Sequence, residues 1–129
     1  MADATVLAAA VFGEREQLQA VALLQGRALV APHLVDYEMT NVALKKVGRG
    51  HLGEEEVVAA LAAYAALAIE RHGIDPAAVL GLAQRYRLTA YDATYLWLAA
   101  RLQAPLATFD GALARAAQDH LAGGASSGD

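Results

Sequence analysis

Four acidic residues of this chain are placed where carboxylates could carry out metal-dependent chemistry. They are Asp3, Glu38, Asp92 and Asp110, and each falls at or near the junction between an extended segment and a predicted helix. Carboxylates that come together repel one another, and their pKa values rise unless a cation joins them. Mg²⁺ or Mn²⁺ suits such a site, because hard cations take oxygen ligands. One or two such ions could activate a water for in-line attack on a phosphodiester.

Each acid also has a plain structural explanation. Asp92 and Asp110 stand where helix N-caps are expected. Glu38 could be a solvated helix residue, and Asp3 lies close to the N-terminus. Spacing alone does not decide between these explanations and a shared acidic site.

The elements that must position these acids alternate along the chain. Short apolar segments predict strands over 28–31 and 105–108, and a short strand or connector over 69–74. Apolar periodicity, caps and glycines predict helices over 3–14 (after a short turn), 15–25, 33–47, 54–68, 76–86, 91–103 and 111–120. This alternation predicts an α/β fold with a parallel sheet flanked by helices, where ligands bind beyond the carboxyl ends of the strands. We expect one domain over 1–122 and a disordered tail over 123–129.

Composition excludes several classes of protein. The chain has 129 residues and no cysteine, which rules out disulfides, thiolate catalysis and Cys-based zinc sites and is consistent with a cytoplasmic location. The longest charge-free internal stretch, 57–69, is shorter than the roughly 20 residues that span a bilayer. The N-terminus lacks the features of a signal peptide, so we expect no membrane association. The net charge of −4 argues against non-specific duplex binding more than against a nuclease.

Other motifs in the sequence lack the context or spacing that their functions require. The segment 48–53 matches GxGxxG but follows a helix rather than a strand, so a dinucleotide site is not expected. The four histidines show no metal-ligand spacing. A phospho-acceptor receiver domain would need a lysine late in the chain, and the only lysines are Lys45 and Lys46.

Two groups of residues keep two interpretations each. Lys45, Lys46 and Arg49 end the helix over 33–47, where they could complement the helix dipole or contact RNA phosphates beside the acids. The aromatic residues at 91, 95 and 97 are interpreted as core or interface rather than base-stacking platforms. An exposed apolar face on their helix would suit a dimer.

The motifs around the acids resemble those of a known family. The opening Asp3-Ala-Thr5-Val-Leu resembles the start of PIN domains, and PHLVDYEMTNVAL at 32–44 resembles their second motif. YDATYL at 91–96 is similar to the YDAxY motif of VapC toxins, and TFD at 108–110 to their closing TxD. The resemblance covers residues 3–118 and points to the PIN-domain family, in particular the VapC-type ribonucleases of VapBC toxin–antitoxin systems.

This resemblance implies a three-layer PIN-like fold and a metal-dependent endoribonuclease. In it, Asp3, Glu38, Asp92 and Asp110 would bind Mg²⁺ or Mn²⁺ and be catalytic, supported by Thr5, Asn41 and Thr108. The implied partners are RNA as substrate, a VapB-like antitoxin and a second copy in a homodimer. Family members have several apolar residues before the first Asp, whereas only Met1 and Ala2 precede Asp3 here. This difference keeps open an alternative, a non-catalytic binding module on the same fold.

Overall fold

The computed structural model describes residues 1–126 of the chain. These residues form helices and two short strands in the alternating order that the sequence predicts. The elements are α1 (Ala4–Phe12), α2 (Gln17–Leu24), β1 (Val30–Pro32), α3 (Leu34–Gly48), α4 (Glu54–Ala65), β2 (Glu70–His72), α5 (Pro76–Tyr86), α6 (Ala90–Arg101) and α7 (Gly111–Ser126).

Side-chain caps set the beginnings of several helices. The Asp3 carboxylate accepts from the backbone N–H groups of the first turn of α1. Asp75 does the same for α5, which starts with Pro76 as predicted. Thr89 caps α6. These side chains satisfy N–H groups that have no partner within their helix.

Two pairs of extended segments run between the helices. β1 pairs with β2 in parallel, with Val30 opposite Glu70. A single parallel bridge joins Ala2 to Ala107, and the Asp3 N–H donates to the Ala107 carbonyl at 3.1 Å. Parallel segments end at the same edge, so Asp3 and the residues after Ala107 emerge side by side.

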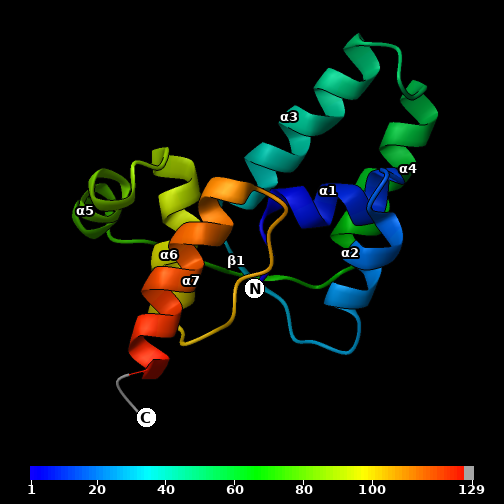
Figure 1. The fold of residues 1–129 in the computed structure, drawn as a ribbon. Helices are drawn as coiled ribbons and strands as arrows, with labels where there is room; N and C mark the ends of the chain where they lie inside the picture. The colour runs from blue at the N-terminus through cyan, green and yellow to red at the C-terminus, as the bar shows by residue number, and fades with distance from the viewer. Residues whose placement is uncertain (127–129) are drawn as a thin grey trace.

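The extended segments lie between two groups of helices. Figure 1 shows α1 to α4 on one side and α5 to α7 on the other, with β1 between them. The core joins both groups, since Val6 and Leu7 of α1 and Tyr95 and Leu96 of α6 are all buried in it. The predicted fold class, a short parallel sheet flanked by helices, is confirmed. None of the helices within residues 1–126 is long and apolar enough to cross a membrane.

Some predicted boundaries are wrong. The first strand covers 30–32 rather than 28–31 and ends on a proline. Leu29 accepts from the N–H of Glu70 and His33 donates to the carbonyl of His72. Alternate residues bond to the same neighbour in a parallel pair, so Pro32, which lacks an N–H, faces away from β2. Residues 105–108 form only the bridge at Ala107 rather than a strand.

Helix ends differ as well. α4 stops at Ala65, and Ala68 turns the chain with a φ of 54°. α7 continues to Ser126, so residues 123–126 of the expected tail are helical. Residues 127–129 lie outside the described part of the chain, and so does that portion of the expected tail.

Candidate functional site

Asp3 is the most deeply buried of the four acids. Only 3% of its surface is exposed. Its Oδ1 accepts from the backbone N–H of Thr5 at 3.1 Å and of Val6 at 3.4 Å, and from the Thr5 hydroxyl at 2.5 Å. Its Oδ2 accepts from the Thr108 hydroxyl at 2.6 Å. Although only two residues precede it, Asp3 is therefore held firmly, by the first turn of α1 and by a residue 105 positions away.

Thr5 and Thr108 each act as both donor and acceptor. The Thr5 hydroxyl donates to Asp3 and accepts from the Phe109 N–H at 2.9 Å. The Thr108 hydroxyl donates to Asp3 and accepts from the Asp110 N–H at 3.0 Å. A hydroxyl has one proton, so accepting from the backbone leaves that proton for the carboxylate. Through these bonds the two threonines attach the segment 108–110, which contains Asp110, to the start of α1.

Glu38 reaches the site from the second turn of α3. Its Oε1 accepts a hydrogen bond of 2.6 Å from the hydroxyl of Tyr95, a buried residue of α6. Burial, followed by the bond to Glu38, raises the pKa of the Tyr95 hydroxyl far above its ordinary value. The phenol therefore stays protonated and donates. The pattern of the sequence placed Tyr95 in the core or an interface but did not reveal this partner, because the two residues are 57 positions apart.

Asp92 and Asp110 have different local roles. Asp92 is not a helix cap, as one interpretation had it, because Thr89 caps α6 and accepts from the Asp92 N–H at 3.1 Å. Asp110 does cap α7, since its Oδ2 accepts from the Leu113 N–H at 2.9 Å. Capping leaves Oδ1 of Asp110 free for another partner, so the structural role and a role in the site are compatible.

Three of the four carboxylates have raised pKa values. Burial raises the pKa of Asp3, against the hydrogen bonds from Thr108 and Thr5. Burial is also the main cause of the raised pKa of Glu38, to which the charges of Asp3 and Asp92 add. Burial, then the charges of Asp110 and Asp3, raise the pKa of Asp92. The four residues that the sequence singled out are thus brought into one electrostatically coupled group.

Helix ends offset part of this repulsion. Asp3, Asp92 and Asp110 stand at the N-terminal ends of α1, α6 and α7. Each helix N-terminus carries a partial positive charge that stabilises a nearby anion by about 0.3–1 kcal/mol. The N-termini of α1, α6 and α7 therefore each stabilise one of these carboxylates.

The site offers the oxygen ligands that a hard divalent cation takes. All four groups are carboxylates, and within the described residues Glu38 Oε2, Asp110 Oδ1 and both Asp92 oxygens accept no hydrogen bond. In residues 1–126, no three acidic or histidine side chains have the spacing to hold one ion directly. Mg²⁺ commonly binds one or two carboxylates and keeps several waters. The residues fit an ion held directly by one or two carboxylates and through water by the others.

A groove of about 440 Å³ leads away from Glu38. Its lining includes the acids Glu14, Glu16 and Glu38, together with Thr5, Asn41, Lys45 and Phe109. Asn41 and Lys45 follow Glu38 at three- and seven-residue intervals, so they share one face of α3 as expected. Both side chains are exposed and accessible to a ligand in this groove.

The other predicted phosphate contacts lie differently. Lys46 forms an ion pair with Glu14 at 3.3 Å, and its ammonium lies 5.7 Å from the centre of the Phe12 ring. It joins α3 to the end of α1, so its charge already has a partner. Arg49 follows the end of α3 and is exposed.

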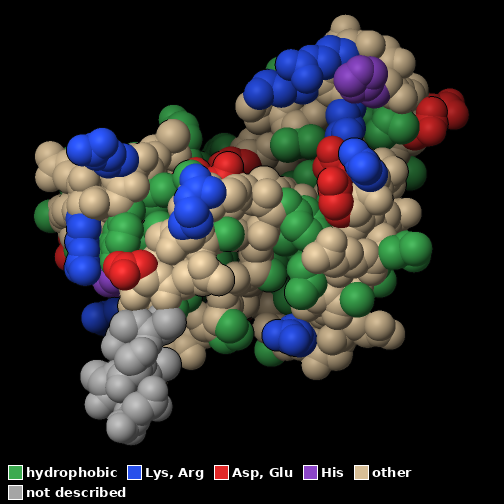
Figure 2. Space-filling view, in the orientation of Figure 1, with side chains coloured by type: hydrophobic (Ala, Val, Ile, Leu, Met, Phe, Trp, Pro, Cys, Tyr) green, Lys and Arg blue, Asp and Glu red, His purple; other side chains and the backbone are tan. Residues whose placement is uncertain are grey.

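Figure 2 shows the charges on one face of the molecule. Acidic side chains lie in a recess between the two groups of helices, and Lys and Arg side chains stand on both sides of it. On this face, positive groups therefore flank an acidic recess, although the net charge of the chain is −4.

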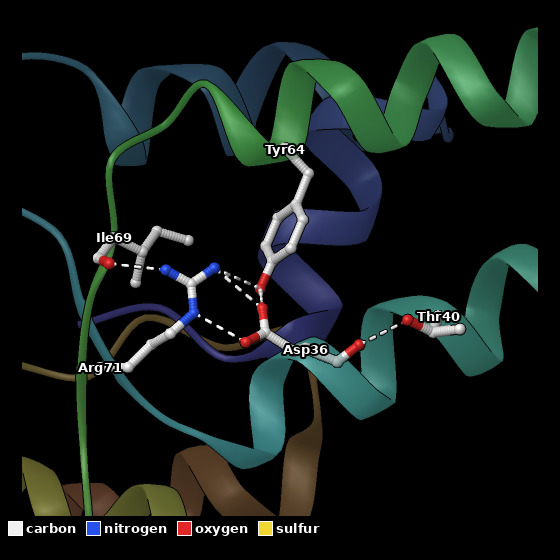
Figure 3. A network of polar contacts seen from close by, with 5 residues as sticks. All are labelled: Asp36, Thr40, Tyr64, Ile69 and Arg71. Carbon is white, nitrogen blue, oxygen red and sulfur yellow. Dashed lines mark hydrogen bonds and ion pairs between the residues drawn. The ribbon is translucent and has the colours of Figure 1, made fainter.

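A second polar network lies close to Glu38 and was missed at the level of sequence. Arg71 of β2 donates from Nε and Nη2 to the two oxygens of Asp36, each at 2.8 Å. The Tyr64 hydroxyl of α4 donates to Asp36 at 2.6 Å (Figure 3). The Arg71 guanidinium holds the pKa of Asp36 below its usual value. This network ties α3 to β2 and α4 two residues before Glu38, and no local pattern pairs residues 36 and 71.

Comparison with known proteins agrees with this geometry. The PIN domain family model matches residues 1–119. The chain belongs to the PIN domain family. This PIN domain is 38% identical to Ribonuclease VapC1 of Mycobacterium tuberculosis over 87 residues, which is 67% of the chain and 65%, just under two thirds, of that protein. It is 33% identical to VapC ribonuclease Mb0985 of Mycobacterium bovis over 113 residues, 84% of the chain and 83% of that protein. The resemblance to VapC-type PIN domains noted from the motifs is confirmed.

Proposed function

We propose that this PIN domain is a Mg²⁺- or Mn²⁺-dependent endoribonuclease and the toxin of a type II toxin–antitoxin pair. The observation that carries the proposal is the convergence of Asp3, Glu38, Asp92 and Asp110 into one coupled group where α1, α6 and α7 begin. The VapC proteins that resemble this chain are named ribonucleases, which supports RNA as the substrate.

The chemistry divides between the acids and their surroundings. A bound Mg²⁺ or Mn²⁺ would supply acidity to water and positive charge to the phosphate. Asp3, Glu38, Asp92 and Asp110 would hold the ion. Thr5 and Thr108 keep Asp3 in one orientation through their hydroxyl protons.

The groove would hold the RNA strand next to these acids. Lys45 would contact a phosphate, and Asn41 would hydrogen-bond to a ribose or a phosphate oxygen. Arg49 would extend this path at the end of α3. We do not expect Lys46 to contact the strand, because its charge is paired with that of Glu14, which itself lines the groove.

Three further proposals follow from the VapC resemblance. A VapB-like antitoxin would bind the toxin and block the site, and both would act in the cytoplasm.

The toxin would form a homodimer. Light scattering should then give about twice the 13.5 kDa mass of one chain, and a mass of one chain at micromolar concentration would contradict the dimer.

Cleavage of a labelled single-stranded RNA tests the enzymatic proposal. Wild type should cut with Mg²⁺ or Mn²⁺ and stop with a chelator. Asp92→Asn should lose about a hundredfold or more in rate, because several kcal/mol of charge stabilisation depends on the site. Glu55→Gln removes an exposed acid of α4 outside the groove and should cut like wild type. Equal cleavage by wild type and Asp92→Asn would exclude the proposed site.

The second candidate is a PIN-fold module that binds RNA without cutting it. It is favoured by one observation, that no three acids within residues 1–126 have the spacing to hold an ion directly. RNA binding by wild type with no Mn²⁺ uptake in calorimetry would support this candidate.

A further inference from the structure

The hydroxyl of Tyr95 has one partner in the described structure, the carboxylate of Glu38. Tyr95 lies in the middle of α6 with 1% of its surface exposed. Its hydroxyl is 2.6 Å from Oε1 of Glu38, which accepts no other hydrogen bond from residues 1–126. A buried hydroxyl without a partner costs free energy, so Tyr95 depends on this bond as much as Glu38 does.

We propose that Tyr95 is a positioning residue, which orients Glu38 for cation binding; this rests on the proposed metal site. Glu38 has three rotatable side-chain bonds, whereas the Tyr95 ring is fixed by the core around it. The bond holds Oε1 against α6 and leaves Oε2 as the oxygen that can face the other acids. A ligand held in one orientation binds a metal ion with less loss of conformational freedom.

Comparison with Tyr64 shows why packing alone does not explain Tyr95. Tyr64 also donates to a carboxylate, that of Asp36, but the Arg71 guanidinium already neutralises this acid. Glu38 instead faces the negative charges of Asp3 and Asp92. A phenylalanine at 95 would fill the same space in the core, so the hydroxyl serves the acid.

Metal affinity tests the proposal directly. Mn²⁺ binding would be measured by calorimetry on wild type, Tyr95→Phe and Tyr91→Phe. Tyr91 lies one turn earlier on α6 and is 61% exposed, which makes it a matched control. We expect Tyr95→Phe to weaken Mn²⁺ binding about tenfold or more, as loss of a hydrogen bond to a metal ligand commonly does. Tyr91→Phe should stay within about twofold of wild type. Equal affinity of Tyr95→Phe and wild type would overturn the proposal.

A double-mutant cycle shows whether Tyr95 acts through Glu38. In a Glu38→Ala background, Tyr95→Phe should have little further effect on Mn²⁺ affinity. The same loss in both backgrounds would overturn the positioning role. If wild type itself bound no Mn²⁺, the metal site would fail with it, and this outcome is distinct from unequal binding by the variants.

An experiment on wild type avoids any change in the core. The chain has five tyrosines, whose ¹³Cζ nuclei can be labelled and assigned. Adding Mg²⁺ should shift the Tyr95 signal, since the bond to Glu38 changes when the carboxylate takes a cation. The Tyr86 signal, whose hydroxyl donates to Asp119, should not move. Binding of Mg²⁺ without a shift at Tyr95 would overturn the proposal.

Discussion

At the scale of single residues, Asp3 shows how a carboxylate can be kept in place inside a protein. Two backbone N–H groups and the neighbouring Thr5 hydroxyl donate to Oδ1, and the hydroxyl of Thr108, 105 positions away in the chain, donates to Oδ2. These bonds oppose the effect of burial, which raises the pKa of Asp3. Thr108 contributes twice, because it also accepts from the N–H of Asp110.

Replacing Thr108 by valine should therefore destabilise the protein and the site together. The change leaves an oxygen of buried Asp3 and the N–H of Asp110 without partners, so we expect a loss of about 1–2 kcal/mol in the free energy of unfolding. Urea unfolding measures this. Thr40→Val is the control, because Thr40 is exposed and its hydroxyl donates only to the Asp36 carbonyl one turn earlier. We expect its effect to stay within about 0.5 kcal/mol. Equal stability of the two variants would contradict the role given to Thr108.

At the scale of elements, α3 divides its basic residues between two tasks. Lys45 faces the groove beside Glu38, whereas Lys46, one residue on, pairs with Glu14 and covers Phe12. Adjacent residues of a helix point about 100° apart, so neighbouring lysines meet different surroundings. Lys45 and Lys46 therefore have different partners, although they are adjacent in the sequence.

Alanine substitutions should separate these tasks. Lys45→Ala should weaken RNA binding and lower the salt dependence by about one phosphate contact, with stability unchanged. Lys46→Ala should cost about 1 kcal/mol of stability, through the lost ion pair and packing, and should leave the salt dependence of RNA binding unchanged. Fluorescence anisotropy in a chelator at several salt concentrations, with thermal melting, measures both. A reversed assignment of the two effects would contradict this division.

At the scale of the whole molecule, the acidic centre opposes folding when no cation is present. The pKa values of Asp3, Glu38 and Asp92 are raised in the folded protein, so these groups bind protons more tightly there than in the unfolded chain. Their contribution to stability is fully present below the ordinary carboxyl pKa values and is lost as pH rises through the raised ones. Asp36 has the opposite sign: its lowered pKa adds stability that is fully present above the ordinary carboxyl pKa, so its contribution does not change at higher pH.

The metal-free protein should accordingly become more stable as pH is lowered through the raised pKa values of these carboxyl groups toward their ordinary values. Asp92→Asn removes one repelling charge, so it should unfold at a higher temperature than wild type near neutral pH and show a smaller pH dependence. Mg²⁺ should stabilise wild type more than this variant. Thermal melting across pH, with and without Mg²⁺, measures these effects. Lower stability of Asp92→Asn at neutral pH would contradict the electrostatic argument.

Local features that the sequence carries by itself determined most of the elements of this PIN domain. The helix starting at Pro76, the apolar face of α3 and the alternation of short strands with helices follow from caps and periodicity between near neighbours. The four acids could be named because motifs place each at a strand–helix junction. The same local signals set helix ends poorly, since α4 ends at Ala65 and α7 at Ser126 rather than at the predicted residues.

Tertiary structure alone decided which side chains meet. Tyr95 with Glu38, Arg71 with Asp36 and Lys46 with Glu14 join residues 32 to 57 positions apart. No periodicity links such pairs, because each contact depends on how two helices, or a helix and a strand, pack against each other. The raised pKa values have the same origin. A carboxylate is desolvated by whatever folds over it, and that depends on the whole chain.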